Sequence, residues 1–509
     1  MYTHQLIELL KTFSEKEMMK LFKFLHSPYF NNSKRIIALY QVLKKFYPDF
    51  DKKNLSREYI FKSVFKNAVY NDSTFRNLMS DLLQLTLKFL MVENIVKKEI
   101  ESTFYVTQDL FSRGNIDLFK LKMNFINQSL NEISNYDSDY FHNKYRAETD
   151  HFYVNLLTNK VLKKQIVIKE SEKLLDGLVS FSNYFALESL KHNDNLLNYS
   201  RTYNIKSNIN KVNQFLEILN FENLIKYIRE NSSKDIPIVE LYYNLLKASA
   251  NFEEDKYYFR LKESVFKCSE QLGLNDNNFL HSRMIDYCVK KINLGIHSSF
   301  DLNEEIFQLY QIYVKNEYYK TLSSTNLPFD AYRNVLLNCI TTKKLKEMEE
   351  FIIEYSKKLL PKHIDSVVNY SYALLYFEKG LFNKAMIFLN KIKFDQFVYK
   401  IDMKNLQLKL AFELEHYESA ISIIDTYKHF LKNNTLISES RKIMHNNFLN
   451  FTNKLIQYKF GSTKVYLPLI KDQLEKSKDV FDKGWLIEKS KLMMGSNALQ
   501  NKKKFSLNI

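Results

Sequence analysis

The chain has 509 residues and a formal net charge of +16, yet it contains only 8 Gly and 6 Pro. Because β-rich folds need frequent Gly and Pro turns, this composition argues against sheets and favours an extended all-α fold. The positive charge is concentrated at the two ends, with a net +7 over residues 1–100 and +10 over residues 361–509, where it could steer an acidic partner, although a solvated lysine face is the simpler interpretation.

The first hundred residues are predicted to form a compact helical domain. Ser14 and Glu17 have the spacing of a capping box, which predicts a helix over Glu15–His26 that ends before Pro28. Asn32 or Ser33 can cap a second helix that ends before Pro48. Ser56 is expected to cap a short third helix, and the run Asn71-Asp72-Ser73 a long fourth one.

Three short runs in this region carry a resemblance: Phe24–Asn31 (FLHSPYFN), Lys45–Phe50 (KFYPDF) and Thr74–Leu82 (TFRNLMSDL). They resemble the opening of a group of uncharacterised large α-helical, tetratricopeptide-like proteins of Bacteroidetes-type bacteria. The resemblance spans about the first 95 residues and the hairpins over 366–432. It implies a helical-repeat fold and a bacterial lineage, and it implies no activity.

A helix-turn-helix over Ser56–Leu90 is the alternative interpretation of the N-terminal domain. The second helix would then present Arg76, Asn77 and Ser80 to a DNA groove. However, the connection over 67–72 is longer than the usual three or four residues and lacks a turn glycine. Lys also greatly outnumbers Arg, whereas base-edge readout favours the guanidinium group. A plain helical cap domain is therefore the preferred interpretation.

Residues 101–235 and 236–465 are predicted to form further helical hairpins. Turns are expected at Gly114, near Asn251–Asp255 and near Gly295. The polar segment 193–213 and the break before Pro237 are the candidate boundaries, and residues 466–509 are expected to form a C-terminal helix with a basic tail.

Two hairpins over 366–432 can be superposed in sequence. The small, aromatic, turn and bulky positions of a tetratricopeptide-type hairpin are Ala373, Tyr376, Gly380, Phe382, Ala385 and Leu389 in the first, and Ala411, Tyr417, Ala420 and Ile424 in the second. The interval from Ala373 to Ala385 recurs from Leu408 to Ala420 and from Leu336 to Met348. The sequence therefore predicts an irregular α-solenoid of tetratricopeptide-like hairpins behind an N-terminal helical cap domain.

Two departures from the tetratricopeptide pattern leave an alternative open. Asn369 and Lys404 stand where the pattern has Trp, and the closing Pro is missing after both hairpins. The alternative is an irregular α-helical domain in which two hairpins happen to be similar.

Motifs that carry chemistry are absent from the sequence. Glycines are never closer than 11 residues (Gly484 to Gly495), which excludes the phosphate loop and the dinucleotide fingerprint. Histidines do not form HExxH or HxH pairs, and no cofactor or metal is expected. The cysteines Cys268, Cys288 and Cys339 lack CxxC spacing and are typical of core thiols in a reducing compartment. Cys268 or Cys288 with His281 could form a nucleophile and base only in an unusual fold.

The sequence thus predicts a cytoplasmic, non-catalytic scaffold that binds a protein or peptide partner, potentially an acidic one. We expect the first helices of the hairpins to bind it through Asn369, Lys404, Gln407 and Lys409. Reversing the charge of Lys404 and Lys409 is expected to weaken binding and leave folding intact. The alternative function is a nucleic-acid-associated regulator whose basic N-terminal domain contacts phosphate while the repeats act as a sensor or dimerisation domain.

Overall fold

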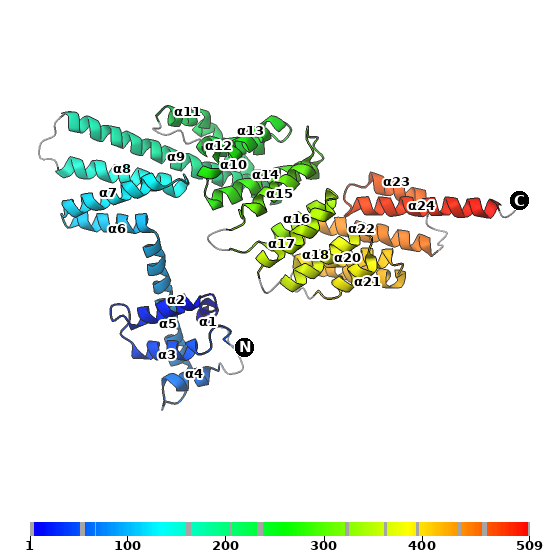
Figure 1. The fold of residues 1–509 in the computed structure, drawn as a ribbon, viewed down its shortest axis with the longest axis horizontal. Helices are drawn as coiled ribbons and strands as arrows, with labels where there is room; N and C mark the ends of the chain where they lie inside the picture. Colours follow the sequence, from blue (N-terminus) through cyan, green and yellow to red (C-terminus); the bar gives the residue numbers. More distant parts are fainter. Residues whose placement is uncertain are drawn as a thin grey trace. The chain divides into compact units, whose positions relative to one another are not determined.

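The structure is a computed structural model that describes residues 5–50, 56–66, 68–158, 164–203, 206–231, 238–320, 325–360, 364–392, 397–434, 437, 439–460 and 466–506. Over these residues the chain is helical from α1 to α24 and contains no strand (Figure 1), which confirms the prediction of an all-α fold. The chain divides into two compact units, Met1–Tyr243 and Asn244–Ile509, within α12 (Ile238–Ala250). The domain boundaries expected at residues 100, 235 and 465 stay predictions.

The first unit begins with a bundle of α1 (Gln5–Leu10), α2 (Glu15–His26), α3 (Lys34–Lys44), α4 (Arg57–Val64) and α5 (Asp72–Lys97). Helix α2 covers the predicted residues, and its capping box forms through Ser14 and Glu17, whose carboxylate accepts from the Ser14 amide at 2.8 Å. Ser56 and Asn71 cap α4 and α5 as predicted, whereas Ser33 precedes α3 without a side-chain capping bond.

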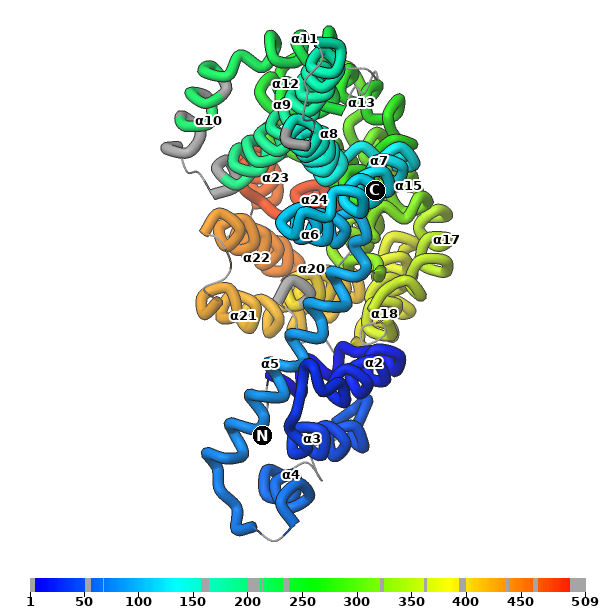
Figure 2. The backbone as a smooth tube through the Cα atoms, turned by 90° about the vertical axis from the view of Figure 1, so that its left-hand side faces the viewer, coloured from blue at the N-terminus to red at the C-terminus, as the bar shows by residue number. Residues whose placement is uncertain are grey.

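Helix α1 was not expected from the sequence, but it completes the core of this bundle. Its Leu6, Ile7 and Leu10 are buried together with apolar residues of α2, α3, α4 and α5. Helix α5 then continues beyond the bundle to α6 (Figure 2). The core of the N-terminal bundle is therefore formed by residues from one continuous stretch of the chain.

The remainder of the first unit consists of α6 (Glu99–Ser112), α7 (Ile116–Glu132), α8 (Ser138–Thr158), α9 (Lys164–Tyr203), α10 (Lys206–Leu219) and α11 (Phe221–Asn231). Helix α9 enters the polar segment 193–213 and continues to Tyr203. Asn193 and Asp194 are buried, and the Asn193 amide donates to the Ser189 carbonyl at 2.7 Å. The polar residues in the first half of this segment thus belong to a helix, and the candidate boundary within 193–213 stays a prediction.

The second unit contains the end of α12, α13 (Asp255–Cys268), the short 3-10 helix η1 (Ser269–Gln271), α14 (Leu274–Leu294), α15 (Leu302–Lys315), α16 (Phe329–Thr341), α17 (Leu345–Tyr355) and η2 (Ser356–Lys358). It continues with α18 (Ile364–Glu378), α19 (Phe382–Leu389), α20 (Phe397–Glu413), α21 (Tyr417–Asn433), α22 (Glu439–Lys459), α23 (Leu467–Lys476) and α24 (Lys483–Ser506). None of the helices in the described parts of either unit combines the length and apolar character of a membrane span.

Three hairpins of the second unit end their first helix in the same way. Lys343, Gly380 and Glu415 each adopt the left-handed conformation, with φ of 59°, 71° and 58°. The next amide in each case donates to a carbonyl five residues back at 2.8 Å, which defines a Schellman cap. These turns follow α16, α18 and α20, so the repeat register predicted from sequence coincides with a repeated backbone structure.

The predicted repeat positions lie at equivalent places around these turns. Seven residues before, five after and nine after the left-handed residue, the side chains are buried in all three hairpins: Leu336, Met348 and Ile352; Ala373, Ala385 and Leu389; Leu408, Ala420 and Ile424. Ala411 matches Tyr376 rather than Ala373, and Tyr417 matches Phe382. Tyr376, Phe382 and Tyr417 are partly exposed.

The α6/α7 hairpin of the first unit turns at Gly114 as predicted, and its turn has the same structure as those of the three hairpins, an equivalence that the sequence did not suggest. Gly114 has φ of 73°, and the Asn115 amide donates to the Leu110 carbonyl at 2.9 Å. Thr107, Phe119 and Met123 occupy the three equivalent positions and are buried.

Replacing Ala385 or Ala420 by Phe is expected to destabilise the second unit by about 1 to 3 kcal/mol, because both alanines are fully buried where two helices of a hairpin meet. Unfolding can be followed by the fluorescence of Trp485, the single tryptophan, which is buried in this unit. The controls are Asn383→Phe and Ser419→Phe, because these neighbours are exposed. Parent-like melting of both alanine variants would contradict the packing at these positions.

Candidate functional site

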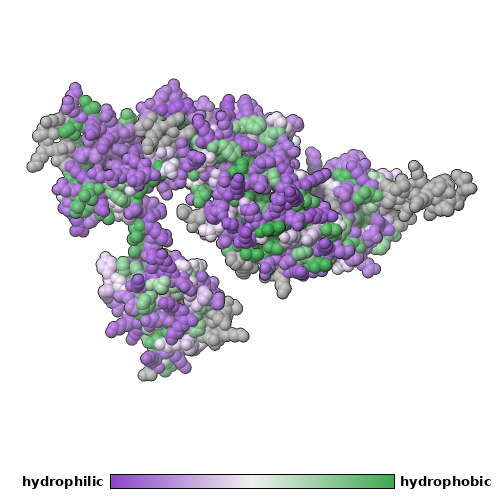
Figure 3. All heavy atoms as spheres, in the orientation of Figure 1, coloured by the Kyte–Doolittle hydropathy of each residue, from purple (hydrophilic) through white to green (hydrophobic). Residues whose placement is uncertain are grey.

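The candidate binding surface of the second unit is formed by the first helices of the hairpins, α16, α18 and α20. Each helix packs on its neighbour in sequence, and α18 also packs directly on α20. The first helices are thus adjacent, as a shared binding surface requires. Figure 3 shows mostly hydrophilic residues, with scattered hydrophobic ones, on the visible face.

All four residues expected to bind a partner are partly exposed, and Asn369, Lys404 and Gln407 are considered first. The Asn369 amide donates to the Asp365 carbonyl of its own helix at 2.8 Å. The Lys404 ammonium lies 5.8 Å and 5.9 Å from the ring centres of Tyr427 and Phe430, and partial burial lowers its pKa. Their role in binding stays a prediction.

Lys409, the fourth residue, is engaged within the protein. Its ammonium lies 2.6 Å from Asp482, the residue before α24, and is placed over the rings of Phe377 and Trp485, at 4.5 Å and 5.6 Å from their centres. The side chain is only 13% exposed. Reversing its charge would place two carboxylates side by side, so only Lys404 is suited to a binding test that preserves the fold.

A charged group that the sequence did not reveal connects the first helices. Arg333 of α16 donates through Nη2 to Asp402 Oδ1 at 2.7 Å and through Nε to Oδ2, forming a bidentate pair between α16 and α20. Burial alone would lower the pKa of the Arg333 guanidinium, but the hydrogen bonds to Asp402 raise this pKa above its ordinary value. Burial also raises the pKa of Tyr370 on α18, which bonds to Arg333. The cluster therefore spans three successive first helices.

A second buried cluster joins α20, α21 and α22. The Tyr427 hydroxyl donates to Asn405 Oδ1 at 2.9 Å, and His445 Nδ1 lies 3.1 Å from the same hydroxyl. Because a phenol carries one proton, the His445 Nδ1–H donates to the Tyr427 oxygen. Burial, with a contribution from Arg441, lowers the pKa of His445 to about 4, so this imidazole is neutral at pH 7.

The third cluster lies among α13, α14 and α15. Lys291 is fully buried and pairs with Asp255, whose carboxylate also accepts from the Ser299 amide at 2.7 Å and from the Ser298 and Ser299 hydroxyls. Burial alone would raise the pKa of Asp255, but the hydrogen bonds from Lys291 and Ser299 lower it to about 2.

Four aromatic rings stack beside this ion pair. Phe252, Tyr287, Tyr258 and Phe300 follow one another with centre distances of 5.0, 4.7 and 5.3 Å and nearly parallel planes. The Tyr258 hydroxyl donates to Glu305 at 2.6 Å. The arrangement fixes α13 against α14 and α15 through ring packing and satisfied polar groups.

The cysteine and histidine pair considered from sequence lies in the same region. Burial raises the pKa of Cys288 to about 12, so its thiol is protonated at pH 7 rather than activated as a thiolate. His281 Nδ1 donates to the Asn277 carbonyl at 2.9 Å, and burial lowers the pKa of His281 to about 4. Its Nε2 has no acceptor among the described residues, so a second proton there would be unpartnered.

The second unit is expected to lose stability on acidification through His281 and His445. Both have a pKa of about 4 in the fold against an ordinary value of 6.5, so the unfolded chain binds more protons between these pH values. Their contribution is complete above pH 6.5 and is lost as the pH falls to 4. Between pH 7 and 5.5 we expect a loss of about 1.2 kcal/mol for each histidine.

The measurement is denaturant unfolding followed by Trp485 fluorescence at several pH values. His281→Gln and His445→Gln should each reduce the loss between pH 7 and 5.5, whereas the exposed His429→Gln should not. Asp255 does not interfere, because its lowered pKa affects stability only below pH 4. An unchanged pH dependence in both variants would show that these imidazoles do not control the acid response.

The candidate helix-turn-helix is α4 followed by α5. Helix α4 packs mainly on α3, and α5 packs on α1, α2 and α3, so α4 and α5 do not form an extensive pair. Asn77 and Ser80 are exposed on α5, while Arg76 is paired with Asp72 at 3.0 Å. An ion pair at 3.0 Å joins Arg57 of α4 to Asp72 of α5, and the sparse packing between the two helices does not favour a helix-turn-helix. Its role in DNA binding stays a prediction.

Among the described residues, no group of three or more His, Cys, Asp or Glu side chains is arranged to hold a metal ion. The chain matches no protein-family model, no curated protein and no solved structure. The class of protein is therefore defined by its fold alone, a protein of helical hairpins in two compact units.

Proposed function

We propose that the protein is a non-catalytic scaffold that binds a protein or peptide segment on the first helices of the α16–α21 hairpins. The observation that supports this most is the equivalence of the three hairpins, which share a turn, a register and buried packing positions. Repeated hairpins place corresponding helices next to each other and create an extended surface suited to a partner segment.

The polar clusters of the first helices give this proposal a mechanism. The Arg333–Asp402 pair holds α16 and α20 in a fixed arrangement with α18 between them in sequence. A fixed surface reduces the entropy cost of binding, because its backbone is already ordered before the partner binds. The partly exposed Asn369, Lys404 and Gln407 would then contact the bound segment.

The test is an affinity capture from native lysate, with and without nuclease, followed by titration of the captured partner. Lys404→Glu is expected to weaken an acidic partner by about 0.5 to 1 kcal/mol, the range of a surface ion pair. The control is Lys346→Glu on the second helix α17, whose side chain is 87% exposed. Equal loss in both variants would locate binding elsewhere.

The nuclease arm tests the alternative function. If the dominant ligand is nucleic acid, nuclease treatment removes it, and its affinity falls steeply with salt. That result would replace the scaffold proposal by a nucleic-acid-associated regulator acting through the basic residues of 1–100. Turnover of a substrate by the purified protein would also contradict the proposal.

A further inference from the structure

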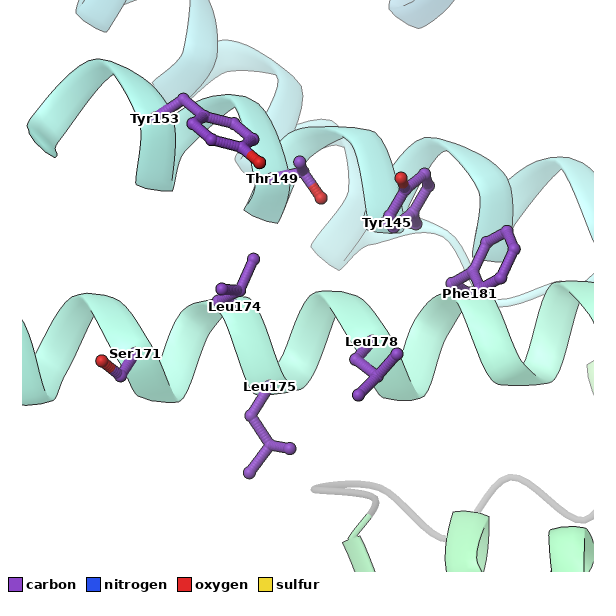
Figure 4. A pocket seen from close by; sticks show the side chains of 8 residues that line it. All are labelled: Tyr145, Thr149, Tyr153, Ser171, Leu174, Leu175, Leu178 and Phe181. Atoms are coloured by element: carbon purple, nitrogen blue, oxygen red, sulfur yellow. The ribbon is translucent and has the colours of Figure 1, made fainter. Parts of the chain in front are cut away.

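Helices α8 and α9 of the first unit form an antiparallel pair with an open apolar groove on one side. The groove has a volume of about 520 Å³ and is lined by Tyr145, Thr149, Tyr153, Ser171, Leu174, Leu175, Leu178 and Phe181. Figure 4 shows Leu174 and Phe181 directed towards the α8 side chains, whereas Leu175 points away from α8. The groove contains no charged side chain, so it is suited to an apolar occupant.

The exposed side of α9 carries a regular seam. We define the α9 seam as Val167, Ser171, Leu174, Leu178, Phe181 and Phe185, which follow one another at intervals of four, three, four, three and four residues. All six are exposed. This spacing places them on one face and is the pattern by which helices pack on other helices in coiled coils. Leu174 and Phe181 reach towards α8, where Phe181 contacts the Tyr145 ring at 5.1 Å, but all six seam residues remain exposed within the described chain.

The exposed apolar area is large enough to form an interface. Four other exposed apolar side chains extend the patch: Tyr153 and Leu156 of α8, and Ile168 and Leu175 of α9. These four and the five apolar residues of the seam are each between 37% and 54% exposed. At about 150 to 200 Å² for each side chain, their exposed parts sum to roughly 600 to 800 Å². A standard stable interface buries about 800 Å² on each partner, and monomers rarely expose contiguous patches of this size.

We propose that the α9 seam is a homodimer interface, on which a second copy of this chain docks with its own α9 antiparallel about a two-fold axis at Asp176. The seam is symmetric about that residue, so Val167 would face Phe185 and Leu174 would face Leu178 of the second copy. A two-fold interface requires such self-complementarity.

Charge complementarity at the ends of the seam favours this occupant. The same symmetry places Lys164 opposite Glu188, twice in each dimer, so that opposite charges meet at both ends. Between them the six seam residues carry no charge. Asp176, at the level of the axis, is two residues and about 200° from Leu174 and Leu178, so it lies on the other side of α9. The proposal concerns the first unit and is independent of the partner surface assigned to the second.

The test is sedimentation equilibrium of the full chain. The parent is expected to be a dimer at micromolar concentration, and Leu178→Glu is expected to raise the dissociation constant at least tenfold, because it introduces a charge at the centre of the interface. Leu178 is half-exposed in the single chain, so folding should persist, which circular dichroism would verify. Leu121→Glu is the control, because Leu121 is exposed on α7 outside the seam.

A charge exchange tests the antiparallel geometry. Lys164→Glu is expected to weaken the dimer by up to tenfold, and adding Glu188→Lys is expected to restore it, whereas a parallel pairing would not be rescued. A monomeric parent, a dimer unaffected by Leu178→Glu, or a dimer dissociated equally by Leu121→Glu would overturn the proposal. A monomer whose seam binds a helix of another protein would identify a different occupant.

Discussion

Replacing Lys291 by Met is expected to destabilise the second unit by about 3 to 5 kcal/mol, the largest effect that we predict. Lys291 is fully buried, and its removal leaves the Asp255 carboxylate, which is only 14% exposed, without its cationic partner. The Ser298 and Ser299 groups would still donate to this carboxylate, but they carry no charge to offset its desolvation. Denaturant unfolding followed by Trp485 fluorescence measures the loss.

Two further variants isolate the cause of this effect. Lys256→Met removes the lysine next to Asp255, but Lys256 is exposed and pairs with Glu254 at the surface, so the change should stay within about 1 kcal/mol. Adding Asp255→Asn to Lys291→Met should recover part of the loss, because no unpaired charge then remains in the interior. If Lys291→Met unfolds at the same denaturant concentration as the parent, the ion pair is not a stabilising element.

Replacing Arg333 by Met is expected to cost about 2 to 4 kcal/mol, somewhat less than a fully buried pair because the Arg333 side chain is 22% exposed. The change leaves Asp402 of α20, which is 9% exposed, without its bidentate partner. Amide hydrogen exchange should increase in α16, α18 and α20 more than in α13 and α14. This pattern of exchange would show that the Arg333–Asp402 pair stabilises the packing of the first helices.

The geometry of the Arg333 fork can be separated from its charge. Arg333→Lys retains the charge but cannot bond both oxygens of Asp402 in one plane, so we expect an intermediate loss. Lys346→Met is the matched surface control, because Lys346 and Glu350 form an exposed pair at 3.9 Å. Equal stability of Arg333→Met and Lys346→Met would refute a structural role for the cluster.

Local sequence signals predicted the all-helical fold and the register of the three hairpins, although they did not reveal α1. Local signals suffice for this, because capping residues such as Ser14 act within one turn and small residues recur at fixed intervals around Gly380. The repeat over Leu336–Ile352 was visible only as an interval, because Lys343 takes the left-handed conformation that glycine usually occupies. Glu415 does the same in the next repeat but one, over Leu408–Ile424.

The tertiary structure alone decided which charged residues are available for binding. Lys404 and Lys409 are both lysines of one predicted helix. Lys404 lies over the rings of Tyr427 and Phe430, whereas Lys409 is paired with Asp482, 73 residues away in sequence. The sequence alone also did not reveal the Arg333–Asp402 pair or the exposure of the α9 seam. Ion pairing and exposure depend on which distant helices pack together, and helical periodicity specifies a face but not its neighbour.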